Sequence, residues 1–277
     1  MKKESKKFTI QKLINKSYYE KDEEKYLDYI WELRTRGNKE VFYQAKHLIY
    51  SKDDIYRKIG ADILAQFGYK TKLYRGENIY LLAKLLDDKN ESVVASAIYG
   101  LGHKHSVRYA DKLASFTKSS SLEIKRALAF ALGGFEKPKA IKALIELMND
   151  NDFDVRNWAT FSLGSICESN TSQIRQALHH KLTDCEPEIH GEAMIGLALR
   201  KDERVKEAII KDLQQEFYGS WIFESIVEMP DIRYKNYFQN YIENLEQEDK
   251  KAFQIDIQNA KKALIVSIKK NFISGLN

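Results

Sequence analysis

The chain has 277 residues, 43% of them hydrophobic, which is enough for one elongated domain or two compact ones with a sizeable core. The formal net charge is +5, but residues 1–76 carry 18 Lys and Arg against 11 Asp and Glu, whereas residues 77–277 carry 27 against 29. The dense basic stripe typical of a nucleic-acid-binding domain is therefore missing from the later two thirds. The sequence has no apolar run of roughly 18 residues and no apolar signal-peptide core, so we expect a cytoplasmic protein without membrane contact.

The elements expected in chain order are a basic arm or first helix over 1–23, a long helical region over 24–230, and capping helices over 231–277. In the middle region apolar residues recur with the period of an α-helix. One stretch shows the spacing i, i+3, i+4 and i+7 at Ile141, Leu144, Ile145 and Met148. Sustained alternation of apolar and polar residues, which would predict strands, is absent from the sequence. We therefore expect an all-α chain built from pairs of helices.

Related stretches recur along this region and predict the second helix of each pair. They share a β-branched residue, with offsets of 38, 31, 31 and 34 between Ile55, Val93, Ile124, Val155 and Ile189. The copy over 50–68 matches more loosely and allows a shift of one residue. Five residues earlier, three copies have an aspartate that can accept the free N–H groups at a turn or helix start: Asp88, Asp150 and Asp184. Nine residues later, three copies have a glycine that can end the helix or admit a neighbouring helix: Gly102, Gly133 and Gly164. This recurrence predicts a superhelix of about six to seven helical pairs.

One copy has the complete pattern D-x-x-x-x-V-R-x-x-A-x-x-x-L-G, on Asp150, Val155, Arg156, Ala159, Leu163 and Gly164. The pattern resembles the second helix of short HEAT repeats, and the resemblance implies an α-α superhelix, a HEAT/armadillo-like solenoid. Other copies depart from it at the arginine position, which holds Val94, Lys125 and His190. The stretches "DVRNWATFSLG", "EAMIGLALRKDERV" and "YRKIGADILAQ" resemble bacterial YibA-type HEAT-repeat proteins, and this resemblance covers residues 24–230.

Proteins of the YibA type are found beside Rhs-type polymorphic toxin genes and are regarded as immunity proteins. The resemblance therefore implies a protein partner, a cognate toxin domain that the chain binds and neutralises. From the residues themselves we expect a curved stack whose concave face suits stoichiometric recognition of another protein. A general protein-binding scaffold or adaptor is the alternative. A nuclease toxin would require an acidic inhibitor surface, which the near-neutral charge of residues 77–277 neither supports nor excludes.

The sequence contains no pattern for catalysis, a metal or a cofactor, so we expect a non-enzymatic protein without a small-molecule substrate. None of the six His is followed by Glu, whereas HEAT-like di-iron hydroxylases use His-Glu dipeptides. The two cysteines, Cys167 and Cys185, lack the spacing of a zinc site and are expected to be free buried thiols. The acidic "DNDFD" stretch over 150–154 does not match the spacing of an EF-hand loop.

A nucleic-acid-binding or DNA-glycosylase-like HEAT protein is the less favoured alternative. Its sequence signal would be the arginines at the start of second helices, Arg57, Arg126 and Arg156. They could face a phosphate backbone, or they could pair with acidic residues of the adjacent repeat, which is the commoner role. Trp158 and Trp221 lie in apolar helices and are expected in the core rather than as base-stacking platforms.

We expect the partner to contact the exposed edge of the second helices. In three consecutive repeats this edge is predicted to contain Lys125, Arg126, Arg156, Asn157, Thr160, His190 and Met194. Side chains at these positions can also bond between repeats, so each has a structural alternative.

Overall fold

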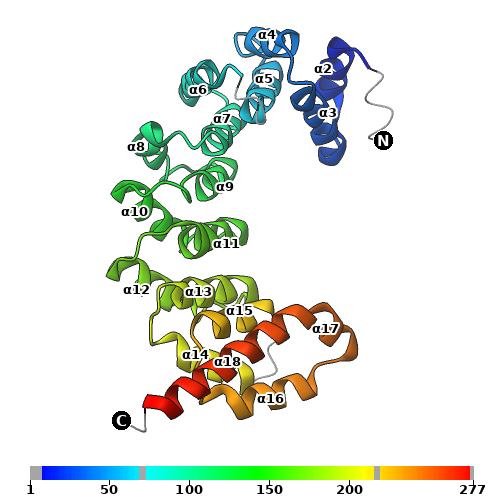
Figure 1. Cartoon of the computed structure of the whole chain (residues 1–277). Helices are drawn as coiled ribbons and strands as arrows, with labels where there is room; N and C mark the ends of the chain where they lie inside the picture. The colour runs from blue at the N-terminus through cyan, green and yellow to red at the C-terminus, as the bar shows by residue number, and fades with distance from the viewer. Residues whose placement is uncertain (1–7, 69–72, 215–218, 275–277) are drawn as a thin grey trace. The chain divides into compact units, whose positions relative to one another are not determined.

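The computed structural model describes residues 8–68, 73–214 and 219–274, with the side chains of the last helix described to Val266. Within these ranges the regular secondary structure is helical throughout, which confirms the predicted all-α class (Figure 1). In sequence order there are seven successive helical pairs from α2 to α15, followed by α16 to α18. Over the described residues, no helix is both long and apolar enough to cross a membrane. The chain divides into two compact units, residues 1–147 and 148–277.

The first unit consists of two layers of helices. In chain order it contains α2 (Ile10–Tyr19), α3 (Glu23–Arg36), α4 (Lys39–Leu48), α5 (Asp54–Gln66), α6 (Arg75–Lys84), the 3-10 turn η1 (Leu85–Asp87), α7 (Glu91–His103), η2 (Val107–Tyr109), α8 (Ala110–Ala114), α9 (Leu122–Ala131) and α10 (Pro138–Leu147). The helices α5, α7 and α9 pack side by side, α4 packs against α5, and α6 packs against α7 (Figure 1). The second helices α5 and α7 are thus each covered by their own partner and by their neighbours in the stack.

The second unit repeats this arrangement. It contains α11 (Phe153–Phe161), which continues into the π-helical turn η3 (Ser162–Ile166), then α12 (Ser172–Lys181), α13 (Pro187–Leu199), α14 (Val205–Gln214), α15 (Ser220–Glu228), α16 (Tyr234–Asn244), α17 (Gln247–Ala252) and α18 (Gln254–Ser274). Here α11, α13, α15 and α18 pack in succession, while α14 contacts α16. The predicted divisions at residues 23 and 230 stay predictions, and residues 1–7 of the N-terminal arm lie outside the described residues.

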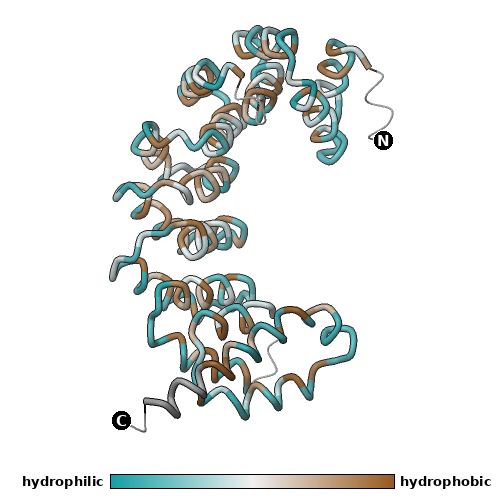
Figure 2. Tube along the Cα trace, in the orientation of Figure 1, coloured by the Kyte–Doolittle hydropathy of each residue, from teal (hydrophilic) through white to brown (hydrophobic). Residues whose placement is uncertain are grey.

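Hydrophobic and hydrophilic residues, brown and teal, alternate along the described helices, as expected for helices with one apolar side (Figure 2). The β-branched positions Val93, Ile124, Val155 and Ile189 are buried, and each is the third residue of its helix. The equivalent residue of α5 is Tyr56, because Ile55 is the second residue and is 42% exposed. The copy at Ile55 is therefore shifted by one residue, the alternative that its looser sequence match left open.

Short polar side chains start the second helices, as the aspartate pattern predicted. The backbone N–H groups of Asn90, Asp152 and Glu186 donate to the carboxylates of the residues two positions earlier, Asp88, Asp150 and Asp184. Asn90 and Asp152 then act as N-caps, accepting hydrogen bonds from the N–H groups of Val93 and Val155. These bonds satisfy donors that a helix leaves free at its first turn.

We call the helices that pack in succession within each unit the inner helices: α5, α7 and α9 in the first unit, and α11, α13, α15 and α18 in the second. Glycine allows two inner helices of the second unit to approach closely at one point. A Cβ on Gly196 of α13 would lie 2.6 Å from the Cα of Gly164 in η3, a separation that real side chains do not tolerate. The buried guanidinium of Arg200 donates to the carbonyl oxygens of Leu163, Gly164 and Gly196 at 2.7–2.8 Å and also reaches those of Cys167 and Ser169. Arg200 thus satisfies the carbonyl groups at the end of η3, which the π-helical turn leaves without helical partners.

Candidate functional site

The arginine of the HEAT pattern links two repeats. Arg156 Nε lies 3.5 Å from Asp184 Oδ2, and Nη1 donates to the carbonyl oxygens of Asp150 and Asn151 at 3.0 and 2.9 Å. The side chains of Arg156 and Asp184 are 15% and 9% exposed. The guanidinium is therefore engaged by the turn of its own repeat and by the aspartate that starts the next.

Arg57 of the first unit makes the same set of contacts. Its Nε and Nη2 atoms lie 2.7 and 2.9 Å from the two carboxylate oxygens of Asp88, and Nη1 donates to the carbonyls of Ser51 and Lys52. Since both Arg57 and Arg156 pair with the aspartate of the following repeat, the predicted alternative of inter-repeat pairing is confirmed for these two. Neither presents a free guanidinium to a phosphate backbone.

His190 occupies the same helical position in α13 and makes a similar link. Its Nε2 atom lies 2.7 Å from Asp212 Oδ2 of α14, and Nδ1 lies 2.9 Å from the carbonyl oxygen of Leu182. Burial of the ring opposes its positive charge, but the hydrogen bond to Asp212 and the charge of that carboxylate outweigh burial and raise the pKa of His190. Lys125 and Arg126 of α9 are half-buried and also have intramolecular interactions.

Two further predicted contact residues lie inside the molecule. Thr160 and Met194 are fully buried, and the Thr160 hydroxyl donates to the carbonyl oxygen of Arg156 at 2.8 Å. Asn157 is half-buried. The prediction that Thr160 and Met194 lie on an exposed edge was therefore wrong. Because successive helical residues are rotated by about 100°, an edge displaced by one position faces a neighbouring helix instead of solvent.

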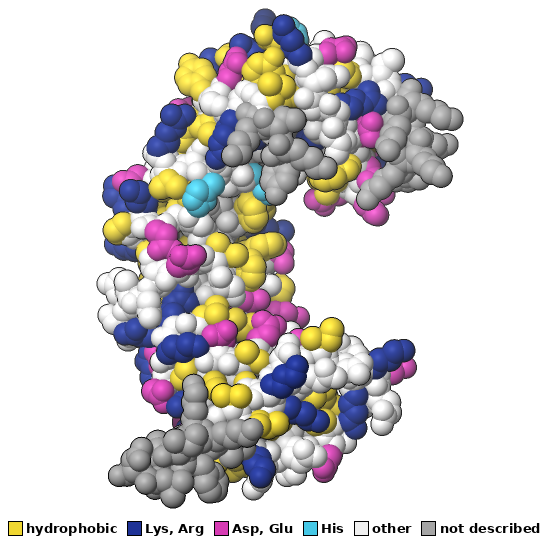
Figure 3. Space-filling view, in the orientation of Figure 1, with side chains coloured by type: hydrophobic (Ala, Val, Ile, Leu, Met, Phe, Trp, Pro, Cys, Tyr) yellow, Lys and Arg dark blue, Asp and Glu magenta, His cyan; other side chains and the backbone are white. Residues whose placement is uncertain are grey.

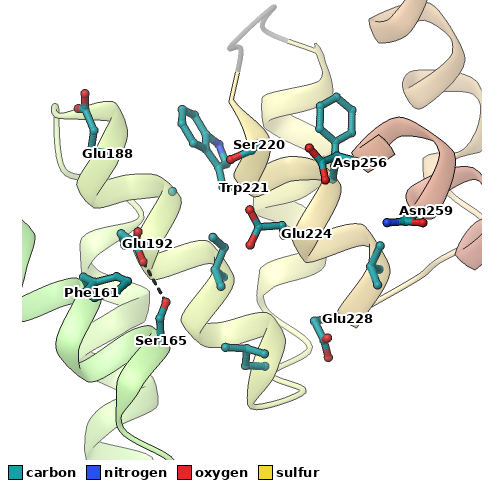
Figure 4. A pocket seen from close by; sticks show the side chains of 15 residues that line it. Phe161, Ser165, Glu188, Glu192, Ser220, Trp221, Glu224, Glu228, Asp256 and Asn259 are labelled. Carbon is teal, nitrogen blue, oxygen red and sulfur yellow. Dashed lines mark hydrogen bonds between the residues drawn. The ribbon is translucent and has the colours of Figure 1, made fainter. Parts of the chain in front are cut away.

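The exposed side of the inner helices holds a different set of residues, which surround a pocket of about 490 Å³ in the second unit (Figure 4). We call it the acidic pocket. It is lined by Phe161, Ser165, Glu188, Gly191, Glu192, Ile195, Leu199, Ser220, Trp221, Phe223, Glu224, Val227, Glu228, Asp256 and Asn259. These side chains come from α11, η3, α13, α15 and α18. Acidic and hydrophobic side chains also lie beside one another over α13 and α15 in the space-filling view (Figure 3).

Among the described residues, five carboxylates and no lysine, arginine or histidine line the acidic pocket. Glu228 pairs with Lys201 at 2.7 Å. For the other four, Glu188, Glu192, Glu224 and Asp256, the described part of the chain supplies no ion pair. The pocket therefore carries an excess of negative charge that the described residues of the unit leave uncompensated.

Glu192 is half-buried, as are Asp256 and Glu228, whereas Glu188 and Glu224 are exposed. Ser165 Oγ donates to Glu192 Oε2 at 3.0 Å, as the dashed line shows (Figure 4). Burial raises the pKa of Glu192; the Ser165 hydrogen bond lowers it, and the charge of Glu224 raises it further, so that the net direction is upward. A cation placed beside Glu192 and Glu224 would favour both charged carboxylates.

The rest of the pocket wall is largely apolar, with Ser165, Ser220 and Asn259 as its uncharged polar side chains. Leu199 and Val227 are 43% and 40% exposed, and the apolar residues Phe161, Ile195 and Trp221 are half-buried. Next to the pocket, Trp158 is 43% exposed, with its ring 5.8 Å from that of Phe161 in an edge-to-face arrangement. The prediction that Trp158 lies in the core was wrong, and Trp221 lines the pocket.

No residue of this carboxylate cluster was singled out from the sequence, although a signal exists. Glu188 and Glu192 are spaced i, i+4 in α13, and Glu224 and Glu228 are spaced i, i+4 in α15. Like charges at this spacing lie on one helical face and destabilise the helix by a few tenths of a kcal/mol, so two such pairs on neighbouring helices, with a lysine partner for Glu228 alone among the described residues, indicate a surface kept for another purpose.

The sequence also makes predictions about metal binding and about the two cysteine thiols. Over the described residues, no group of three or more His, Cys, Asp or Glu side chains is arranged to hold a metal ion. Cys167 is buried, as expected, whereas Cys185 is exposed, contrary to the expectation of two buried thiols. Cys185 lies in the short turn before α13, where the chain passes over the surface.

Comparison with known proteins adds family information. The family model described as HEAT repeats matches residues 110–174. Protein YibA of Escherichia coli (strain K12) is 32% identical over 207 residues, which cover 72% of this chain and 73% of the relative, and Protein YibA of Escherichia coli O157:H7 matches equally. The X-ray structure of Escherichia coli YibA is similar, with a TM-score of 0.73 and 26% identity, covering 95% of this chain and 94% of that one. An engineered protein, with a TM-score of 0.52 and 18% identity over 93% of this chain and 81% of its own, shows the fold alone.

Proposed function

The chain belongs to the family of YibA-type HEAT-repeat proteins, and from this premise we propose that it is a non-catalytic immunity protein that binds and neutralises a cognate protein toxin. The fold supports a binding role, because stacked helical pairs expose long rows of side chains from successive inner helices. The proposal that the partner is a toxin is based on the resemblance to YibA-type proteins, which are regarded as immunity proteins against Rhs-type toxins.

The observation that carries the proposal is the acidic pocket. Exposed hydrophobic side chains such as Leu199 and Val227 cost free energy in water unless a partner covers them. Four carboxylates without ion pairs beside them add a charge that a complementary partner can match. Hydrophobic and charged groups side by side form the usual anatomy of a protein–protein interface.

Neutralisation by binding requires no chemistry from this chain. A tight stoichiometric complex of ordinary interface size suffices to cover or hold the active surface of a toxin. The inter-repeat pairing of Arg57 and Arg156 disfavours a nucleic acid as the ligand, because the guanidinium groups that would contact phosphates already bind aspartates.

Co-purification with the product of the gene adjacent to its own tests the proposal. We expect an equimolar complex by size-exclusion chromatography with light scattering, and restored growth of cells poisoned by that product when the two are expressed together. An adjacent product that neither co-purifies nor loses toxicity would refute the immunity function. Rescue without a complex would contradict neutralisation by binding.

A further inference from the structure

We infer that the acidic pocket receives an arginine-bearing segment of the protein partner, an inference that rests on the proposed binding function. The pocket has two properties that together specify such an occupant. Its carboxylates select positive charge, and its apolar wall selects a side chain with a long hydrophobic stem or a flat face.

The charge argument begins with the arrangement of the carboxylates. Glu192, Glu224 and Asp256 project toward the pocket from α13, α15 and α18, which pack against one another in that order (Figure 4). Glu192 is half-buried, so its charge is less well solvated than that of a surface glutamate, as the upward shift of its pKa indicates. A cation inserted among these groups relieves both the poor solvation and the mutual repulsion.

The size of the pocket excludes a bare ion as the natural occupant. About 490 Å³ lies within the range of pockets that hold drug-sized ligands, and it is large enough for two or three side chains of a peptide segment. The described residues also lack a group of ligands able to hold a metal ion. The partner segment must therefore bring its charge on an organic side chain.

Arginine fits the pocket better than lysine. The guanidinium is planar, binds carboxylates through paired N–H groups and stacks on aromatic rings. The pocket supplies carboxylates and the half-buried aromatic side chains of Phe161 and Trp221 together. Lysine would satisfy the charge but would use the aromatic faces less well, because its ammonium is compact and strongly hydrated.

Fluorescence anisotropy with labelled octapeptides on the intact protein tests this inference. The probes are an alternating Arg-Leu peptide, the same peptide with citrulline for arginine, the same peptide with lysine, and free spermidine as competitor. We expect the Arg-Leu peptide to bind more tightly than about 1 mM, the citrulline peptide to bind at least about tenfold more weakly, and the lysine peptide to fall between them. Binding of the Arg-Leu peptide should weaken with salt.

The matched variants are Glu192→Gln with Glu224→Gln in the pocket, and Glu246→Gln with Glu248→Gln on exposed carboxylates outside it. Both pairs remove the same charge, but only the pocket pair should weaken the Arg-Leu peptide, by at least about tenfold. Circular dichroism and thermal melting of both variants establish that each is folded.

Three results would overturn the inference: no binding of the Arg-Leu peptide at 1 mM, equal binding of the arginine and citrulline peptides, or displacement by spermidine at concentrations below those of the peptide. The test separates the inference from the proposed function. If the adjacent gene product co-purifies equally with wild type and with the pocket variant, immunity stands and the pocket assignment fails. If it binds neither protein while the Arg-Leu peptide still binds, the assignment stands and the immunity function fails.

Discussion

At the scale of single residues, Arg200 is the strongest structural anchor of the second unit. Its guanidinium satisfies buried carbonyl oxygens of η3 and α13. Arg200→Met should lower the free energy of unfolding by roughly 3 kcal/mol, because several buried acceptors lose their donors at once. Arg200→Lys should recover only part of the loss, since an ammonium cannot span the same acceptors. Urea denaturation followed by circular dichroism measures both changes.

Arg233 provides the matched control for this prediction. It forms ion pairs with Asp231 and Glu207, but its side chain is 48% exposed. Arg233→Met should change the unfolding free energy by less than about 1 kcal/mol, because solvent screens exposed pairs. Equal losses for Arg200→Met and Arg233→Met would contradict the special role of Arg200.

His190 predicts a pH dependence of stability. Its pKa in the folded state is raised above the unfolded value of 6.5, so folding favours the protonated ring. The resulting stabilisation is fully present below pH 6.5 and is lost as pH rises through the folded-state pKa. Relative to His190→Gln, the wild type should therefore be more stable at pH 6 by roughly 2 kcal/mol, the usual value of a hydrogen bond to a charged group, and less so at pH 8.5.

Thermal or urea unfolding of wild type and His190→Gln at several pH values measures this difference. The variant retains a hydrogen-bonding side chain beside the buried Asp212 but carries no titrating charge. A stability gap that stayed constant from pH 6 to 8.5 would show that the His190 charge does not contribute.

At the scale of helices, the close contact between η3 and α13 predicts that an added methyl group there lowers the free energy of unfolding. Gly196→Ala places a methyl group 2.6 Å from the Gly164 Cα, so the two helices must separate. We expect a loss of roughly 2 kcal/mol, typical of overpacking in a well-packed region. Gly76→Ala in α6 is the control: nothing lies within 4 Å of its added methyl, and alanine's helix propensity should give a small gain. A neutral Gly196→Ala would mean that the contact is not tight in solution.

Helices and their pairing could be predicted because they depend on local pattern. The buried third position at Val93, Ile124, Val155 and Ile189, and the aspartates before the helix starts, follow from residues close in sequence. The α5 alignment stayed open by one residue at Ile55 because Ile and Tyr stand side by side there, and only the helix start at Asp54 decides which of them faces inward.

The candidate site was beyond prediction because it depends on stacking between helices. Glu192 and Glu224 are 32 positions apart and become neighbours only when α13 packs against α15. For the same reason the exposure of Trp158 and the burial of Thr160 could not be derived from helical period alone: a one-position error rotates the expected face by about 100°.

At the scale of the whole molecule, stability should be local along the chain. The most extensive helix contacts join successive inner helices, α5 with α7 and α7 with α9 in the first unit, and α13 with α15 and α15 with α18 in the second. In such repeat proteins each element is stabilised chiefly by its nearest neighbours. A destabilising substitution should therefore loosen its own surroundings and leave distant repeats unchanged.

Hydrogen exchange of the Arg200→Met variant measures this locality. Amides of α11 to α15 should exchange about a hundredfold faster than in the wild type, the factor that corresponds to a loss of roughly 3 kcal/mol. Amides of α4 to α7 should keep their wild-type rates, because these helices belong to the first compact unit and Arg200 to the second. Acceleration by the same factor along the entire chain would instead mean that the molecule opens as one cooperative unit, and the nearest-neighbour account of its stability would have to be abandoned.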